Sequence, residues 1–136
     1  GNTVVAISPD HKTLYHAAAV MVSNQIVALA DMGTALLVKC GFSEAAAAEA
    51  LAPLLLGNAQ SVAEKGAVNA LTGPIERGDA QTVSKHLQEI RKFAAESTVG
   101  QDILTAYTAL SKQLIRIAQQ KHPHKDYKHL EKELEQ

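Results

Sequence analysis

The chain has 136 residues, of which 46% are hydrophobic and 20% are charged, and its formal net charge at pH 7 is −1. This length suits one ordinary domain with a buried core. Alanine is abundant, aromatic residues make up only 4%, and β-branched runs are few, so closely packed helices are favoured over a sheet. The basic residues form no patch interleaved with aromatic residues, which argues against a nucleic-acid partner. We therefore expect a single all-α domain.

The sequence also predicts a cytoplasmic protein without a membrane partner. The single cysteine, Cys40, has no partner for an internal disulfide, and no segment has the basic start, apolar middle and cleavage site of a signal peptide. The longest apolar segment still carries four polar side chains within any window of membrane-spanning length, which is typical of a core helix in a soluble protein. These four are His16, Asn24, Gln25 and Asp31.

The first 40 residues predict a linker followed by a long helix. Residues 1–8 are apolar and β-leaning, have no partner strand later in the chain, and are interpreted as a linker remnant. Ser8 suits the N-cap of the helix and Pro9 suits its first turn. Most of the circumference of residues 9–40 is apolar, with a far side at helical spacing. We expect this helix at the centre of a helical bundle. The far side comprises Leu14, Ala18, Met21, Val22, Gln25, Leu29, Met32 and Leu36.

A polar stripe runs along the opposite side of the same predicted helix. Its members fall in an arc of roughly 100° and are His16, Ser23, Asn24, Asp31 and Thr34. Buried polar groups need partners, so the stripe predicts either an internal hydrogen-bond network or a ligand site. His16 suits a general acid or base, or a donor to a substrate, and equally a satisfied structural histidine. Asn24 suits a group that orients a carbonyl or amide, and equally a bridge between helices.

The next segment, residues 43–71, predicts two helical pieces. Ser43 suits the N-cap of a short helix, and Pro53 is expected to interrupt it. From Pro53 the helical pattern resumes through Leu71, with a face of small residues that lets another helix approach closely. This face comprises Ala59, Ala63, Ala67 and Ala70, with Gly66 beside them.

Residues 71–79, LTGPIERGD, predict a turn-rich connection. Thr72 and Arg77 suit an anionic group, because a guanidinium and nearby backbone N–H groups bind carboxylate or phosphate well. The alternative is that Arg77 is a solvated loop charge. Asp79 is better explained as the N-cap of the next helix than as a catalytic acid.

Two amphipathic helices and a tail complete the chain. The spacing predicts helices over residues 79–96 and 99–121, the second capped by Ser97 or Thr98 and ended by His122 and Pro123. The expected core stripes are Ala80, Val83, Leu87, Ile90 and Ala94 in the first, and Ile103, Tyr107, Leu110, Leu114 and Ile117 in the second. Residues 122–136 alternate acid and base and predict a charged, solvated last helix. Its histidines suit a metal site or, as the alternative, a solvated tail. They are His122, His124 and His129.

Several enzyme signatures are missing from the sequence. No glycine-rich phosphate loop follows a strand, no Cys/His spacing suits zinc, and no Glu-x-x-His motif suggests a di-iron bundle. We therefore expect no cofactor and no metal to be bound by this chain alone.

Two blocks resemble a known family. They are LYHAAAVMVSNQIVAL at residues 14–29 and ALTGPIERGDAQTVSKHL at residues 70–87, supported by LAPLLLGNAQSV at 51–62 and ILTAYTALSKQLIRIA at 103–118. Together they resemble the C-terminal domain of the Rossmann-like proteins classed as domain of unknown function 2520. That family is similar to pyrroline-5-carboxylate reductases and 6-phosphogluconate dehydrogenases, in which an N-terminal nucleotide-binding domain precedes an all-helical domain. The helical domain there makes the dimer and closes the substrate side of the cleft.

The resemblance implies a function and site residues. It marks Tyr15, His16, Ser23 and Asn24 in the first block, and Thr72, Gly73, Pro74, Arg77, Gly78 and Asp79 in the second. It implies that residues 9–121 form a dimerisation and substrate domain of an NAD(P)-dependent oxidoreductase, whose nucleotide-binding domain is absent from this chain. His16 and Asn24 would be the catalytic groups, and Ser23, Thr72 and Arg77 would bind a small-molecule substrate. NAD(P) would bind to the full-length parent, and the isolated domain would be inactive.

Two alternatives remain open on sequence grounds. One is a purely structural dimerisation module of a protein that binds a nucleotide or metabolite without chemistry, with His16 and Asn24 bridging helices. The other is a free-standing helical adaptor.

Overall fold

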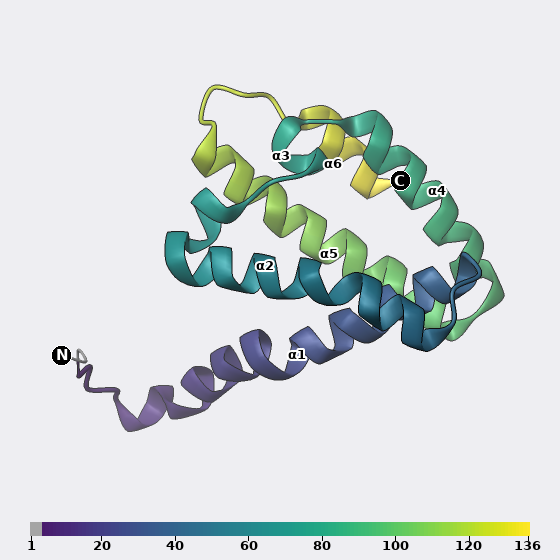
Figure 1. Ribbon diagram of the computed structural model, residues 1–136. Helices are drawn as coiled ribbons and strands as arrows, with labels where there is room; N and C mark the ends of the chain where they lie inside the picture. The colour runs from purple at the N-terminus through teal and green to yellow at the C-terminus, as the bar shows by residue number, and fades with distance from the viewer. Residues whose placement is uncertain (1–3) are drawn as a thin grey trace. The chain divides into compact units, whose positions relative to one another are not determined.

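The computed structural model describes residues 4–136, and every regular element in that range is a helix (Figure 1). The prediction of an all-α chain is confirmed for these residues. The elements in chain order are the 3-10 turn η1 Pro9–His11 and the helices α1 Lys12–Lys39, α2 Glu44–Ala70, α3 Pro74–Arg77, α4 Ala80–Glu96, α5 Thr98–Lys121 and α6 Lys128–Glu135. Of the predicted linker at residues 1–8, residues 4–8 are exposed and carry no helix or strand, and residues 1–3 lie outside the described range.

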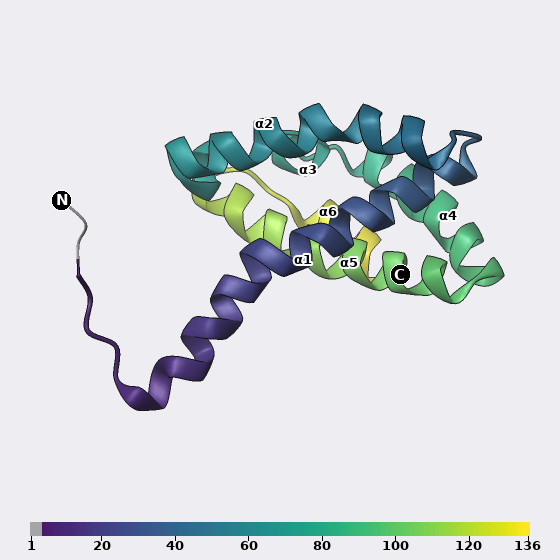
Figure 2. The ribbon, with the colours of Figure 1, turned by 60° about the horizontal axis from the view of Figure 1, so that its bottom comes forward.

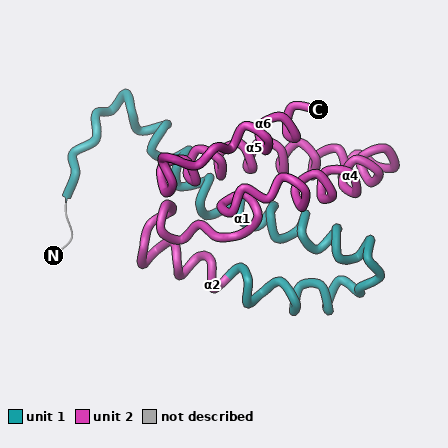
Figure 3. The backbone as a smooth tube through the Cα atoms, turned by 90° about the horizontal axis from the view of Figure 1, so that it is seen from above, with its two compact units in different colours: residues 1–55 teal, residues 56–136 magenta. Residues whose placement is uncertain are grey.

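The chain divides into two compact units, Gly1–Leu55 and Leu56–Gln136, with the boundary inside α2 (Figure 3). The first unit contains η1, α1 and the first part of α2. The second contains the rest of α2 and the helices α3 to α6. The domain boundaries expected at residues 8 and 121 stay predictions.

Local signals set both ends of α1. The long helix was expected to begin at Pro9, but Pro9 opens the 3-10 turn η1 and α1 begins at Lys12. The Ser8 side chain makes no cap, and the Ser8 carbonyl accepts from the His11 N–H at 2.9 Å instead. The chain leaves the helix through Gly41, whose φ of +98° favours glycine. Ser43 then accepts the Ala46 N–H at 3.2 Å, which confirms the predicted cap of the next helix.

The long N-terminal helix is confirmed, and Figure 2 shows α1 as one continuous element. Its predicted position in a core is not observed within one chain, because none of its residues is buried. Exposed apolar residues on its far side include Leu14 (71% exposed), Met21 (62%) and Val22 (78%). The span Pro9–Lys39 is long and apolar enough to cross a membrane by length and composition, and none of its most apolar window is buried. The mostly buried core helix of a soluble protein and an N-terminal signal sequence pass the same test. Helical periodicity indicated which residues share a face, but it carried no information about what covers that face.

The interruption predicted at Pro53 is wrong. The helix continues through Pro53, and the break in α2 lies at Gly66, where φ is 74° and ψ is 164°. This conformation is accessible to glycine because it has no Cβ, whereas a proline inside a helix removes one hydrogen bond without forcing the chain to end there. The small-residue face expected around Gly66 is exposed at Ala59, Ala63 and Ala67.

The second unit has a conventional core. Helix α5 packs against α3, α4 and α6. Predicted caps begin both long helices: Asp79 accepts the Thr82 N–H at 3.0 Å, and Ser97 accepts the Gly100 N–H at 3.0 Å. Four of the five stripe residues expected in α4 are buried, namely Val83, Leu87, Ile90 and Ala94. The core cluster comprises Leu71, Ile75, Val83, Leu87, Ile115, Ala118, Tyr127, Leu130 and Leu134.

The stripe predicted for α5 is partly displaced. Ile103 is buried and Tyr107, Leu114 and Ile117 pack at the edge of the core, but Leu110 is 43% exposed. The buried positions of α5 are Gly100, Ile103, Ser111, Ile115 and Ala118, and of these Ile103 alone belongs to the predicted stripe. Gly100 is required by a close approach, because a Cβ there would lie 2.4 Å from the Phe93 carbonyl oxygen. The predicted stripe comprised large apolar residues. It therefore left out the small residues, such as Gly100, at which α4 and α5 approach each other.

The predicted last helix is present as α6, but the expectation that it is solvated is wrong. Tyr127, Leu130 and Leu134 are 2%, 1% and 5% exposed and belong to the core cluster of the second unit. Their spacing of three and four residues puts them on one face of a helix. The charged residues between them cover the other face, which made the segment look uniformly polar.

Candidate functional site

Three of the predicted site residues lie on α1 in the first unit, and all three are exposed: His16, Ser23 and Asn24. His16 and Ser23 are seven residues apart, which puts them on the same face about 10 Å apart along the axis. Asn24 lies about 80° further round the helix. The Ser23 hydroxyl lies 2.6 Å from the Ala19 carbonyl oxygen and 3.1 Å from the Asn24 Oδ1, and donates its one proton to either.

Some polar groups of the stripe have a hydrogen-bond partner within α1, and others have none among the described residues. Thr34 donates to the Ala30 carbonyl at 3.0 Å, so its hydroxyl, like that of Ser23, is used by the helix itself. His16 and Asp31 are exposed and have no hydrogen-bond partner within residues 4–136. The ring nitrogens of His16 are therefore available to a ligand.

The other two predicted site residues, Thr72 and Arg77, lie in the second unit on the α3 loop, defined here as residues 71–79. Both are exposed. Gly73 has φ +100° and Gly78 has φ +74°, so the predicted turns are present at both glycines. Between them α3 is only four residues long, and Ile75 anchors it in the core.

Asp79 is confirmed as a helix cap. Its carboxylate accepts both the backbone N–H and the hydroxyl of Thr82, the second at 2.7 Å. These hydrogen bonds from Thr82 hold the pKa of Asp79 below its usual value. A carboxylate that is stabilised in its charged form and used by a cap is poorly suited to donate a proton.

Sequence reasoning missed Glu76, the residue of the loop with the most contacts to the end of the chain. Its Oε1 lies 2.6 Å from the His122 Nε2 and 3.9 Å from the Lys121 Nζ. The hydrogen bond from His122, aided by the charges of Lys121, His122 and Lys125, lowers the pKa of Glu76 despite its partial burial. The cluster of basic residues at 121–125 was the available signal, but nothing in the sequence paired it with a residue about 45 positions earlier.

The backbone of the α3 loop is held from the same side. Lys121 donates to the Leu71 carbonyl at 2.8 Å, and Tyr127 donates to the Glu76 carbonyl at 2.9 Å. Lys125 also reaches the Glu76 carbonyl, at 3.4 Å. The segment of residues 121–127 is named here the C-terminal clamp. It gives His122 a structural partner rather than the solvated position expected for it.

The described residues do not form a histidine metal site. His124 and His129 are exposed, and His122 is engaged with Glu76. No group of three or more His, Cys, Asp or Glu side chains within residues 4–136 is placed to hold a metal ion.

A separate polar contact, between His86 and Tyr107, joins α4 and α5. The Tyr107 hydroxyl lies 3.0 Å from the His86 Nδ1, and the rings meet edge to face. Burial raises the pKa of Tyr107, although a hydrogen bond with Ser111 opposes that rise. Tyr107 packs at the edge of the core, as predicted, and its hydroxyl also links two helices.

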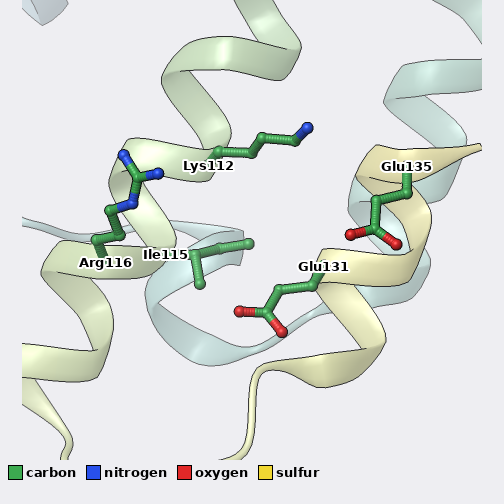
Figure 4. Close-up of a pocket in the computed structure, with 5 residues that line it drawn as sticks. All are labelled: Lys112, Ile115, Arg116, Glu131 and Glu135. Atoms are coloured by element: carbon green, nitrogen blue, oxygen red, sulfur yellow. The ribbon is translucent and has the colours of Figure 1, made fainter.

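A small pocket of about 210 Å³ lies between α5 and α6 (Figure 4). Ile115 lies at its floor, two cationic side chains extend from α5, and two carboxylates extend from α6. The charged residues are Lys112, Arg116, Glu131 and Glu135. None of the residues proposed from the sequence as catalytic or substrate-binding lines this pocket.

Comparison with known proteins identifies the family of the chain. No curated protein and no solved structure matches it. The family model named domain of unknown function, DUF2520, matches residues 1–114. Because this match covers most of the 136 residues, the chain belongs to the DUF2520 family.

Proposed function

We propose that this chain is the dimerisation and substrate-cleft domain of a cytoplasmic NAD(P)-dependent oxidoreductase. Membership of the DUF2520 family supports the domain assignment, and the resemblance of that family to helical domains of known reductases supports the activity. Residues 4–136 contain no strand. The glycine-rich turn that binds a dinucleotide pyrophosphate follows a β-strand. The proposal therefore assigns NAD(P) to a separate nucleotide-binding domain of the parent protein.

The exposed apolar face of α1 supports the proposal that the chain forms a homodimer. A helix of 28 residues is about 40 Å long, and Leu14, Met21 and Val22 on its far side are more than 60% exposed. Contiguous exposed apolar surface on this scale marks an interaction site rather than ordinary surface. A second copy of the chain would cover it and give α1 the central position that its composition predicts.

The polar stripe favours a protein partner over a lipid one. Asp31 lies inside the apolar span, and His16 and Asn24 lie on the same side of the helix. Ionisable groups in a bilayer are costly, whereas a protein interface can leave one stripe of a helix open to a cleft. In a dimer joined through the far side, this stripe would remain available to a substrate.

The proposed chemistry divides between the two groups of site residues. NAD(P)H, bound to the parent protein, supplies a hydride. His16 donates a proton or a hydrogen bond to the substrate, and Asn24 orients its carbonyl. Ser23 lies on the same helix face as His16 and is assigned to substrate binding by the family resemblance, which requires its hydroxyl to exchange the Ala19 carbonyl for the substrate. Thr72 and Arg77 bind an anionic part of the substrate through a hydroxyl and a guanidinium.

A cofactor titration tests the proposal. The full-length parent is titrated with NADH and with NADPH and followed by fluorescence, with the isolated 136-residue chain as the control. We expect binding by the parent and none by the isolated chain. In the parent, His16→Ala should lower turnover by roughly a hundredfold, the lower end of what a general acid contributes. Unchanged turnover and ligand affinity in this variant would remove the role of His16, and a parent that binds neither nucleotide would contradict the oxidoreductase assignment.

A structural dimerisation module is the second candidate, and the hydrogen bonds of the stripe favour it. The hydroxyls of Ser23 and Thr34 are bonded within α1, and the Asn24 Oδ1 is the second acceptor within reach of the Ser23 hydroxyl. Under this alternative His16 and Asn24 bridge helices of two copies. Asn24→Ala would then weaken dimerisation and leave nucleotide binding by the parent unchanged.

A further inference from the structure

We propose that His122 and Tyr127 are positioning residues, which act through Glu76 to hold the α3 loop and thereby Arg77. The part concerning Arg77 rests on its proposed function as a substrate contact. The part concerning the loop rests on contacts within the second unit alone.

The α3 loop needs support from outside itself. Helix α3 has four residues, and it lies between two glycines with positive φ, Gly73 and Gly78. A single helical turn is unstable in isolation, because its nucleation cost exceeds the return from its few hydrogen bonds. Buried Ile75 fixes one side of the turn. The remaining fixed points come from the C-terminal clamp.

The clamp holds the loop at its side chains and at its backbone. The His122 Nε2 lies 2.6 Å from the Glu76 carboxylate, and the Tyr127 hydroxyl donates to the Glu76 carbonyl at 2.9 Å. Lys121 holds the start of the loop through the Leu71 carbonyl at 2.8 Å. The Tyr127 ring is 2% exposed, so its hydroxyl is presented from a rigid position in the core. One residue, Glu76, is therefore held at both its carboxylate and its carbonyl.

The same contacts compensate the charge of Glu76. Its carboxylate is faced by Lys121 and His122 from the end of α5, and by Lys125 and Tyr127 from the segment that follows. Arg77 follows it directly in α3 and is exposed. Without the cationic clamp, a free carboxylate would lie beside the guanidinium and oppose the binding of an anion. With Glu76 compensated, the charges of the loop outside this cluster are the exposed Arg77 guanidinium and the Asp79 carboxylate, which is engaged by Thr82 in the cap of α4.

Family membership does not predict this arrangement. The family model matches residues 1–114, and the clamp lies at residues 121–127, beyond the match. The sequence between the end of α5 and α6 reads as a charged tail, yet His122 and Tyr127 bond to Glu76 of the α3 loop, and Tyr127 belongs to the core cluster.

Amide hydrogen exchange of the 136-residue chain tests the proposal. The reporters are the N–H groups of Arg77, Gly78 and Asp79, which bond to carbonyls of Gly73, Ile75 and Pro74 inside the loop. Tyr127→Phe keeps the buried ring and removes only the hydroxyl, and His122→Ala removes the imidazole. We expect each change to speed exchange of the reporters roughly five- to tenfold, the factor that one lost hydrogen bond corresponds to. Amides in the middle of α4 should keep their rates.

Two further variants make the test specific. His124→Ala is the matched control, because His124 is exposed in the same segment and has no hydrogen-bond partner among the described residues. It should leave the reporters unchanged. His122→Gln restores an N–H donor near the position of Nε2 and should return most of the protection. If His122→Ala fails to fold, Tyr127→Phe and His122→Gln still decide the outcome. Unchanged reporters in both Tyr127→Phe and His122→Ala would overturn the proposal.

A titration with inorganic phosphate distinguishes the proposed role of the clamp from the proposed role of Arg77 as an anion contact. Phosphate is titrated into the unmodified chain while the backbone amide signal of Arg77 is followed. A perturbation that weakens severalfold in His122→Ala supports both the anion contact and its dependence on the clamp. If phosphate leaves the Arg77 signal of the unmodified chain unperturbed, Arg77 is not an anion contact. The exchange rates still decide whether the clamp holds the loop.

Discussion

The imidazole Nε2 of His122 lies 2.6 Å from the Oε1 of Glu76, and this pair joins the end of α5 to the four-residue helix α3 within the second unit. The Glu76 side chain is 19% exposed and that of His122 is 39% exposed, so the contact is partly shielded from water. A partly shielded, hydrogen-bonded pair responds to pH more strongly than a fully solvated one.

The first prediction follows from the lowered pKa of Glu76. Its pKa in the folded chain lies below its ordinary value, because His122 hydrogen-bonds the carboxylate and nearby cations stabilise it. The unfolded chain therefore binds more protons in the window between the two pKa values. The stabilisation is present above the ordinary carboxyl pKa and is lost as the pH falls through the lowered one. Urea unfolding at several acidic pH values measures it, and Glu76→Gln should flatten the dependence. An equally steep dependence in that variant would contradict the prediction.

The second prediction concerns the close contact of α4 and α5. A Cβ at Gly100 would lie 2.4 Å from the Phe93 carbonyl oxygen, a backbone atom that a side-chain rotation cannot move away. Gly100→Ala should lower the free energy of unfolding by about 2 to 3 kcal/mol. The matched control is Gly57→Ala in α2, where nothing lies within 4 Å of the added Cβ. There the better helix propensity of alanine should leave stability equal or slightly raised. Equal effects at the two glycines would show that the contact is not tight.

The third prediction concerns the caps. Ser97 accepts the Gly100 N–H at 3.0 Å, whereas the Ser8 side chain makes no cap bond. Ser97→Ala should therefore lower the free energy of unfolding by about 1 kcal/mol, and Ser8→Ala should leave it unchanged. Thermal and urea unfolding of the two variants measure the difference. A loss at Ser8 as large as that at Ser97 would count against the assigned caps.

The parts of the fold that sequence reasoning predicted depend on local interactions. Asp79 and Ser97 were expected as caps, since a cap bond joins residues three positions apart. The end of α5 at His122 was expected because Pro123 follows. Each of these signals is complete within a few residues.

The parts that sequence reasoning missed depend on contacts between distant segments. Gly100 had no visible role until α4 and α5 were placed side by side. Glu76 and His122 carry no shared motif, so their pairing followed only from the fold. Leu130 was overlooked because the charged residues around it dominate the composition of the segment. The position of α1 could not be predicted at all, since its apolar face is uncovered within one chain.

In the proposed homodimer the far side of α1 joins two copies of the chain, and one pair of variants distinguishes this face from the polar side of the same helix. Val22 lies on that far side and is 78% exposed, whereas Val27 lies on the polar side of the same helix and is 68% exposed. A glutamate buried without a partner costs several kcal/mol, so Val22→Glu should weaken a dimer by roughly a hundredfold or more, and Val27→Glu should not.

Sedimentation velocity without detergent, over a range of protein concentrations, is the measurement. A dimer through the far side of α1 should sediment as a 29 kDa species, twice the 14.5 kDa of the chain, for the unmodified protein and for Val27→Glu. Val22→Glu should sediment as a 14.5 kDa monomer at the same concentrations. A soluble monomer for all three proteins, or an unmodified chain that stays in solution only with detergent or lipid, would contradict the proposed homodimer.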